Sequence, residues 1–446
     1  AREVADSLRP LPRRRSVHDR HGCRGDAAER RRRRRDRGRA DHARDPGGIP
    51  GHRARPQRAL GAVARVRHAR AGRGLSTGLR EIPLARPFLD EREEELVLEV
   101  LRSGRLSLGP TIDRFEELVA ERVGAPYAVA LSSGTAGLHL LARSAGLGRG
   151  DEAITSPLSF ASSANCFIFE GATPVFADVD PRTLNLDPAA LEAAITGRTK
   201  AVVAVDMFGY PCELDEIRAV CEQHGLALIE DSAEALGAEY KGRPVGGHGV
   251  PAVFGFYPNK QVATGEGGVV LTSSEEEWQL LRSLRNQGRD YEGGAWFHHV
   301  RLGWNYRWTD VQAAIGIGQL EKLDRLLALR SEAATRYGRM LEGSGIETLC
   351  TDDADHVRSW FVYVVAVPRG TDRDRVMEEL RAQGIGTADY VPCVHLQPYM
   401  RETYGFTEGL CPVAEEIASR TLALPFYPQL EAEDQQRVVE TLLGAL

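Results

Sequence analysis

The fold is decided by the stretch LALIEDSAE, residues 226–234, in which an apolar run is followed at once by carboxylates. Leu226–Glu230 predicts a buried strand, because a continuous apolar run suits a sheet that is covered on both faces. Asp231 and Glu234 follow directly after this strand. A buried carboxylate at a strand end needs a cationic partner. The stretch therefore predicts a sheet edge that carries charged chemistry.

Strands and helices alternate on both sides of this stretch. Strands are predicted at Ala128–Leu131, Pro174–Asp178, Ala201–Asp206, Leu226–Glu230, Val253–Phe256 and Val269–Thr272. Helices are predicted at Thr135–Ala145, Pro188–Ile195, Leu214–His224 and, as one long amphipathic helix, from about Trp308 to Leu329. This alternation favours an α/β fold with a mostly parallel central sheet.

The length of 446 residues is enough for two or three compact units. We expect a large domain over residues 79–329 and a smaller C-terminal α/β domain over residues 330–446. The smaller domain is predicted from a further helix that ends at about Leu341, a strand at Trp360–Val367 and helices at Asp372–Ala382 and Glu433–Leu443.

The first 80 residues differ sharply in charge from the rest. They hold 24 Arg, no Lys and 8 Asp or Glu, which gives +16, whereas the other residues hold 33 Arg or Lys and 55 Asp or Glu, which gives −22. All 30 aromatic residues follow position 87. This composition predicts a disordered Arg-rich tail over residues 1–78. Two interpretations stay open: translated upstream sequence without function, or a localisation signal or nucleic-acid-binding arm around Arg30–Arg35.

The seven cysteines include no C-x-x-C pair, which argues against a disulfide framework and a zinc site. A reducing cytoplasm and no metal are therefore expected. No stretch of about 20 apolar residues occurs, so we expect no membrane partner.

Two further strand ends carry residues suited to chemistry. Ser132-Ser133-Gly134-Thr135 joins a strand to a helix, so its N–H groups and hydroxyls suit a phosphate, although a simple helix cap explains it as well. Lys260 follows another strand beside a glycine-rich loop and is one of only four lysines. Lys, unlike Arg, can lose its proton and act as a nucleophile.

A phosphate cradle, a strand-end Asp and a strand-end Lys, in this order, are what pyridoxal 5'-phosphate (PLP) requires. The phosphate anchors the cofactor, Asp231 keeps the pyridine nitrogen protonated, and Lys260 forms the Schiff base. The ordered set indicates this cofactor more strongly than any one of its parts.

The motifs around these residues resemble those of the DegT/DnrJ/StrS sugar aminotransferases, which are PLP-dependent enzymes of fold type I. The resemblance covers residues 82–446. Two motifs look similar to the perosamine synthase-like branch: Phe256-Tyr257-Pro258-Asn259-Lys260-Gln261 and, near the C-terminus, His395-Leu396-Gln397-Pro398-Tyr399. The other matching motifs are Ser107–Pro110, Ser133–Thr135, Gly171–Val175, Glu230–Glu234, Tyr257–Lys260, Gly265–Gly268 and Gly303–Arg307.

The resemblance implies a role for each matching residue. Lys260 and Asp231 would be catalytic, with Lys260 linked to the cofactor and shuttling the proton. Glu234 would lie near the phenolic oxygen of the cofactor, and Phe160 would stack on its ring. Gly134 and Thr135 would donate to the phosphate.

The family's site lies across a dimer interface, so the resemblance also implies a homodimer with shared active sites. Asn305 would reach the phosphate of the partner subunit. Arg307 and His395 would bind the substrate, and a guanidinium suits a carboxylate or phosphate.

Two departures from the family pattern stand out. Gly255 occupies the position, five residues before the lysine, where many members have a serine that donates to the phosphate. Asp206 stands where many members carry histidine. Lys260 itself is retained, which disfavours the dehydratase branch that replaces this lysine by histidine.

The expected function is transfer of an amino group from an amino acid, by resemblance L-glutamate, to the ketone of a nucleotide-linked keto-deoxy sugar. Such amino sugars enter polysaccharides or secondary metabolites. The alternatives are a PLP-dependent dehydratase or lyase on the same fold, and a nucleic-acid-binding regulator that uses the Arg-rich tail.

Overall fold

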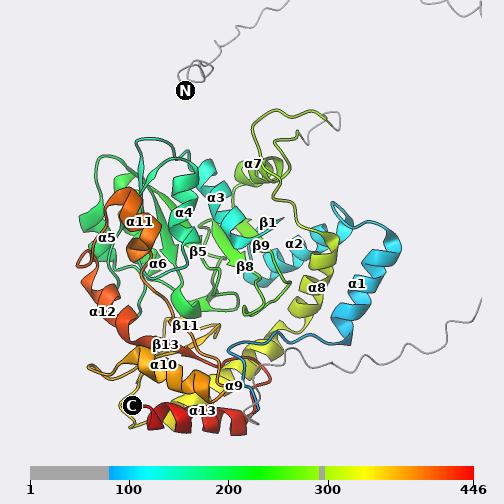
Figure 1. Cartoon of the computed structure of the whole chain (residues 1–446). Helices are drawn as coiled ribbons and strands as arrows, with labels where there is room; N and C mark the ends of the chain where they lie inside the picture. The colour runs from blue at the N-terminus through cyan, green and yellow to red at the C-terminus, as the bar shows by residue number, and fades with distance from the viewer. Residues whose placement is uncertain (1–79, 291–296) are drawn as a thin grey trace, which may run out of the picture. The chain divides into compact units, whose positions relative to one another are not determined.

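A seven-stranded sheet forms the centre of the computed structural model, which describes residues 80–290 and 297–446 (Figure 1). Its strands are β1 Tyr127–Leu131, β2 Glu152–Thr155, β3 Thr173–Phe176, β4 Thr199–Val205, β5 Ala227–Asp231, β8 Ala252–Gly255 and β9 Gly268–Thr272. The order is β1-β9-β8-β5-β4-β2-β3. Neighbours from β8 to β3 are parallel, and only β9 pairs antiparallel with both β8 and β1. The predicted α/β fold with a mostly parallel sheet is confirmed.

Helices cover both faces of this sheet. The helices of this part of the chain are α1 Glu91–Ser103, α2 Pro110–Val123, α3 Gly134–Ser144, α4 Ser162–Phe169, α5 Pro188–Ala194, α6 Leu214–His224, α7 Glu275–Arg285, α8 Asp310–Glu321 and α9 Leu323–Leu341. Of these, α1 packs mainly on α8, and α9 runs on into the C-terminal part. In β4, Val203 and Val205 pack with α3, α4 and α7, whereas Val202 and Ala204 pack with α5 and α6. Because successive side chains of a strand point to opposite faces, the apolar run predicted this double cover.

The single helix expected from Trp308 to Leu329 is wrong, because two helices, α8 and α9, occupy this stretch and continue beyond it. Lys322 lies between them with non-helical backbone angles. Its ammonium pairs with Asp90 at 2.8 Å and with Glu93 at 2.7 Å, at the start of α1. The predicted domain boundary after residue 329 falls inside α9 and stays a prediction.

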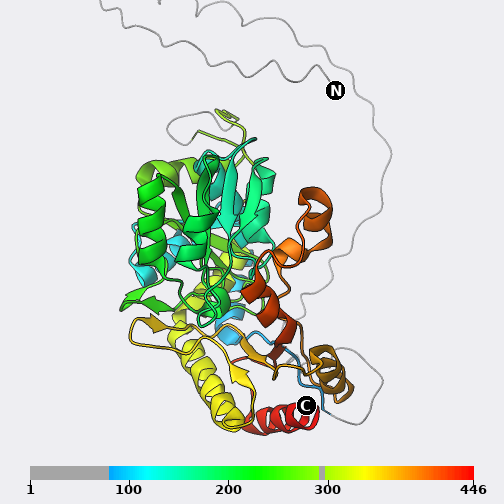
Figure 2. The same ribbon diagram turned by 90° about the vertical axis from the view of Figure 1, so that its left-hand side faces the viewer.

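The C-terminal part adds a second sheet, in the order β10-β12-β13, packed against helices. Its elements are β10 Glu347–Thr348, β12 Tyr363–Ala366, α10 Arg373–Ala382, α11 Pro398–Tyr404, α12 Pro412–Arg420, β13 Thr421–Leu424, α13 Ala432–Gly444 and the short helix η2 Val394–Leu396. Figure 2 shows α13 beside α9, where Tyr337, Leu380 and Val438 share one buried cluster. No helix in the described part of the chain has the length and apolar character to cross a membrane.

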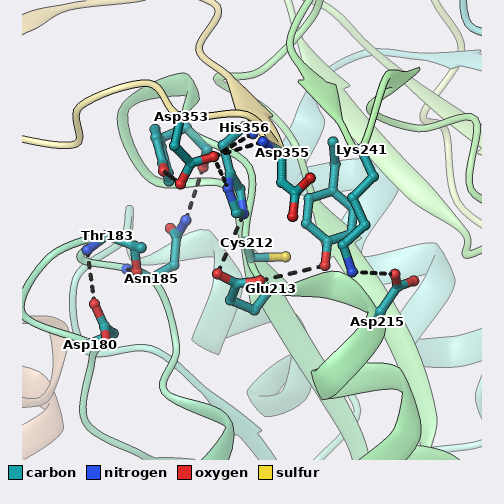
Figure 3. A network of polar contacts seen from close by, with 12 residues as sticks. Asp180, Thr183, Asn185, Cys212, Glu213, Asp215, Lys241, Asp353, Asp355 and His356 are labelled. Carbon is teal, nitrogen blue, oxygen red and sulfur yellow. Dashed lines mark hydrogen bonds and ion pairs between the residues drawn. The ribbon is translucent and has the colours of Figure 1, made fainter.

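A third small sheet joins the C-terminal part to the hairpin after β5, and the side chain of His356 in this sheet contacts the loop after β4. It contains β6 Glu239–Tyr240, β7 Arg243–Pro244 and β11 His356–Val357, and the loop carries the short helix η1 Met207–Gly209. Figure 3 shows His356 between Asp353, at 2.9 Å, and Glu213, at 3.5 Å. Its ring stacks on Tyr210 with centroids 5.1 Å apart. The contacts of His356 with Tyr210 and Glu213 fix the loop that carries η1, and this loop leads into the functional site.

The predicted Arg-rich tail, residues 1–78, lies outside the described residues.

Candidate active site

The carboxyl ends of the central strands border one cavity of about 680 Å³. This is where ligands bind in open α/β sheets. Six predicted site residues line the cavity, namely Gly134, Thr135, Phe160, Asp231, Glu234 and Lys260. The fold therefore brings together residues that are far apart in the sequence and that the sequence analysis had predicted to form one site.

The N-terminus of α3 forms a backbone cradle at the cavity wall. The hydroxyl of Ser133 accepts a hydrogen bond from the N–H of Ala136 at 3.1 Å and caps the helix. Gly134 and Thr135 belong to the first turn, whose N–H groups have no acceptor within the helix. A β-carbon on Gly268 would lie 2.5 Å from the nitrogen of Gly134, so only glycine fits behind the cradle. Exposed N–H groups at a helix N-terminus suit a phosphate.

Asp231, at the end of β5, is a buried carboxylate whose partners in the described part of the chain are neutral. It accepts from the Ser163 hydroxyl at 2.6 Å and from the N–H of Ala233 at 3.3 Å. Burial is the main cause that raises the pKa of Asp231. A protonated ring nitrogen would supply the cation that a buried carboxylate requires.

Lys260 lies between a carboxylate and an aromatic ring. Its Nζ donates to Oε1 of Glu234 at 3.2 Å and lies 3.9 Å from the centroid of the Phe361 ring. The second oxygen of Glu234 accepts from the N–H of Phe208 at 3.0 Å, and the carbonyl of Phe208 accepts from Nε of Arg358 at 2.9 Å. The side chain of Lys260 thus has a fixed direction in the cavity.

Phe160 supplies a flat apolar surface just before α4. Its side chain lines the cavity, yet the residue is 72% exposed. An aromatic ring that few protein atoms cover is available for stacking on a planar ligand. The phosphate cradle, the buried carboxylate, the amine and this ring are the four parts that PLP needs, so the residues present fit the cofactor.

Three predicted site residues do not line this cavity. Asn305 is exposed and forms an isolated backbone bridge with Asn286. Arg307 donates to Oδ1 of Asn286 at 2.9 Å. His395 is fully buried and its Nε2 lies 2.9 Å from Oε1 of Glu415. A fully buried ring has no surface for a substrate, so the structure does not bring His395 to the site.

Two residues of the site were not predicted. Ser163 orients Asp231, and its only signal was the pair of serines that follows Phe160. Phe361 contacts Lys260 from the C-terminal part of the chain. No local pattern could have placed Phe361 there, because the contact depends on how the two parts pack.

Asp206, which stands where many family members carry histidine, lies buried behind the site. Polar atoms of Asp206, Cys212 and Glu230 lie within 4.8 Å of one another. Oδ1 of Asp206 accepts from the N–H of Cys212 at 2.9 Å, and the N–H of Asp206 donates to the carbonyl of Asp231. Burial raises the pKa of Asp206 to about 6 and that of Glu230 well above its usual range. Two such neighbours favour protonated carboxyl groups.

We predict that Asp206→Asn stabilises the fold. The amide retains the acceptor for Cys212 and removes a group whose ionisation opposes folding. Because the pKa is raised, this destabilisation grows as the pH rises from about 4 to about 6 and then levels off. The free energy of unfolding in urea should therefore increase by about 1–3 kcal/mol at about pH 8, and by less at about pH 5.

Asp215→Asn is the matched control for this experiment, because Asp215 is exposed and pairs with Lys241 at 2.8 Å. The Lys241 hydrogen bond lowers the pKa of Asp215, so the control should not stabilise the protein. Equal or lower stability of Asp206→Asn at both pH values would contradict a raised pKa of Asp206.

Comparison with known proteins agrees with the geometry of the site. The spore coat polysaccharide biosynthesis protein SpsC of Bacillus subtilis is 41% identical over 375 residues, which cover 81% of this chain and 96% of SpsC. The structure of S. venezuelae DesV, in complex with a ketimine intermediate, is 34% identical with a TM-score of 0.75, covering 81% of this chain and 98% of DesV.

The sugar aminotransferase Spr1654 of Streptococcus pneumoniae, described as putative, has been solved in a PLP-form and a PMP-form. The PLP-form is 28% identical, with a TM-score of 0.78, and covers 82% of this chain and 98% of Spr1654. These relatives confirm the predicted fold type, enzyme class and cofactor. The profile of the DegT/DnrJ/EryC1/StrS aminotransferase family matches residues 87–443. The chain therefore belongs to this family of PLP-dependent sugar aminotransferases.

Proposed function

We propose that the enzyme transfers an amino group from L-glutamate to the ketone of a nucleotide-linked keto-deoxy sugar. The proposal rests above all on the cavity in which Lys260, Glu234 and Asp231 converge beside the N-terminus of α3. The resulting amino sugar enters a polysaccharide or a secondary metabolite. The naming of SpsC for spore coat polysaccharide biosynthesis supports the first of these destinations.

The residues that hold the cofactor in this proposal come from the ends of three strands, β1, β2 and β5. Gly134 and Thr135 bind the phosphate, Phe160 stacks on the ring, Asp231 holds the ring nitrogen and Glu234 lies near the phenolic oxygen. When bound, PLP supplies an electron sink that stabilises negative charge on the neighbouring carbon.

Lys260 is the residue that moves the proton. Nζ accepts a proton from the bound donor and returns it, while Glu234 and the Phe361 ring keep the amine directed into the cavity. An amine, unlike a guanidinium, can give up its proton and act as a base, so this role requires Lys rather than Arg. Asp231 remains ionised opposite the positively charged ring nitrogen.

A second copy of the chain completes the site in this proposal. The segment before Asn305 exposes Phe297, Val300 and Leu302, of which Phe297 is 81% and Leu302 74% exposed. Large apolar side chains exposed together mark an interaction surface. A homodimer would cover them and bring Asn305 to the phosphate, and Arg307 to the substrate, of the partner subunit.

Mixing two inactive variants tests the shared site. In a mixed dimer of Lys260→Ala with Asn305→Ala, one site has both substitutions and the other has none. Random reassociation should therefore restore about one quarter of the wild-type activity. If mixing restores nothing although an affinity tag on one variant co-purifies the other, Asn305 acts within its own subunit.

Glutamate in the absence of sugar tests the reaction class. An aminotransferase should release one equivalent of 2-oxoglutarate for each active site and then stop, as two half-reactions require. A panel of nucleotide-linked keto sugars should then show glutamate-dependent amine formation on at least one member. Sugar consumption without 2-oxoglutarate would instead indicate the dehydratase or lyase.

Gly255 offers a gain-of-binding prediction. A β-carbon on Gly255 would meet Ala233 at 3.5 Å, an ordinary contact, and the residue lines the cavity beside Gly134. Gly255→Ser therefore adds a hydroxyl donor close to the cradle. Because a hydrogen bond to a charged group contributes about 1.5–3 kcal/mol, the dissociation constant of PLP should fall about tenfold to a hundredfold.

Fluorescence titration of the cofactor-free protein measures this constant. Gly268→Ser is the matched control, because its β-carbon would collide with the backbone of Gly134 and weaken binding. If folded Gly255→Ser binds PLP no more tightly than the wild type, the phosphate does not lie in the proposed cradle.

The reducing cytoplasmic location expected from the cysteines stays a prediction.

A further inference from the structure

A buried arginine lies directly behind the proposed catalytic lysine. Arg330, in α9, is 2% exposed. Its Nη2 donates to the carbonyl of Lys260 at 3.1 Å and to that of Asn259 at 3.3 Å. Its Nη1 donates to the carbonyl of Phe361 at 3.0 Å and to that of Trp360 at 3.5 Å. One guanidinium thus joins two chain segments that are distant in sequence.

Burial of the positive charge of Arg330 without a carboxylate partner in the residues that the structure describes destabilises the fold, which indicates that the arginine has a specific role. The acceptors of Arg330 in the described part of the chain are carbonyl oxygens rather than a carboxylate. Burial lowers the pKa of Arg330 to about 10, which shows how unfavourable the environment is for the charge. Burial of a cation is costly unless hydrogen bonds compensate for the lost water, and the four carbonyls of these two segments accept from Nη1 and Nη2, whereas Nε has no partner among the described residues.

The two segments are those that define the position of the Lys260 amine. The first carries Lys260 itself. The second carries Phe361, whose ring lies 3.9 Å from Nζ. Displacement of either backbone would move the amine relative to its other contact, Oε1 of Glu234 at 3.2 Å.

We propose that Arg330 is a positioning residue that fixes Lys260 and Phe361 relative to each other and thereby aims the lysine amine into the cavity. The inference rests on the proposed role of Lys260. The planar guanidinium presents several donors in a fixed fork, so it can span carbonyls of both segments at once. A lysine at this position would donate all its hydrogen bonds from one nitrogen atom, so it cannot hold both segments equally well.

Three variants test the proposal in the full-length protein. Arg330→Met removes the donors, and Arg330→Lys keeps the charge but not the fork. Arg336→Met is the matched control, because Arg336 lies on the same helix but binds Gln435 and the carbonyl of Leu430. Circular dichroism and elution volume establish whether each variant is folded.

The first readout is the reactivity of the Lys260 amine. Cofactor-free protein is treated briefly with an acetylating reagent, and acetylation of Lys260 is measured by mass spectrometry relative to exposed Lys241. With only four lysines, the peptides are readily distinguished. Release of the amine from its two contacts should raise the relative rate about tenfold in Arg330→Met and less in Arg330→Lys.

The second readout is steady-state kinetics of the PLP-loaded enzyme. Misplacement of a catalytic group by about 1 Å costs about a hundredfold, so kcat of Arg330→Met should fall by about this factor while KM for glutamate changes little. Arg330→Lys should recover part of kcat. Arg336→Met should match the wild type in both readouts.

Three results would overturn the proposal. They are wild-type acetylation and kcat in a folded Arg330 variant, equal changes in Arg336→Met, and failure of both Arg330 variants to fold, which would assign Arg330 to stability alone. The acetylation readout does not depend on the reaction. Retained activity in Lys260→Ala would therefore refute the proposed function without erasing an effect of Arg330 on the amine.

Discussion

Replacement of Lys260 by Ala is expected to abolish amino transfer, lowering kcat by about 10⁴-fold or more. Nζ of Lys260 is the amine that the structure directs into the cavity, between Glu234 and Phe361. Neither neighbour can replace it, because neither the carboxylate nor the ring has an amine that could form the Schiff base. The rate of 2-oxoglutarate release from glutamate measures the loss.

A second measurement identifies the attachment point independently of turnover. Borohydride reduction should fix PLP covalently to the wild-type protein, on the peptide that contains Lys260, and Lys260→Ala should carry no such mass. Lys200→Ala is the control, because Lys200 is exposed and pairs with Asp151 at 3.2 Å. Cofactor that remains covalently bound to Lys260→Ala after reduction would show that another lysine forms the link.

The predicted strands and helices agree with the structure where hydrophobic pattern alone decides. β4 and β5 were predicted because both of their faces are buried, which leaves a continuous apolar run. The break between α8 and α9 was missed, because it depends on Lys322 pairing with Asp90 and Glu93 more than 200 residues earlier. Such a contact leaves no periodic signal.

The same distinction applies to the site. Asp231, Lys260 and the cradle at Gly134 could be selected because parallel strands place their carboxyl ends at one edge. Phe361 and Arg330 could not, since they reach Lys260 only through the packing of the C-terminal part. His395 was included because it lies in a family motif. A motif identifies a position but does not show that its side chain is fully buried, as that of His395 is.

Asp231→Ala is expected to leave a folded protein with weak cofactor binding and kcat lowered by about 10³-fold or more. The carboxylate is buried, and its partners Ser163 and Ala233 are neutral hydrogen-bond donors. A protonated ring nitrogen would lose the anion proposed to hold it, and without that charge the electron sink weakens. Turnover and PLP titration of the purified variant measure the two effects.

The pH dependence of PLP binding separates the charge of Asp231 from its shape. Burial raises the pKa of this carboxyl, so a falling pH protonates it and removes the anion that the ring nitrogen requires. Wild-type affinity should therefore weaken from about pH 8 to about pH 5, whereas Asp231→Asn, of equal size but without charge, should bind weakly at both.

Ser163→Ala provides the graded control for Asp231. It removes the 2.6 Å hydrogen bond to Oδ2 but leaves the carboxylate in place, so kcat should fall only about tenfold. The order of kcat should be wild type, Ser163→Ala, then Asp231→Ala. Because a purely structural Asp231 would affect stability before affinity, undiminished turnover in folded Asp231→Ala would remove this residue from the mechanism.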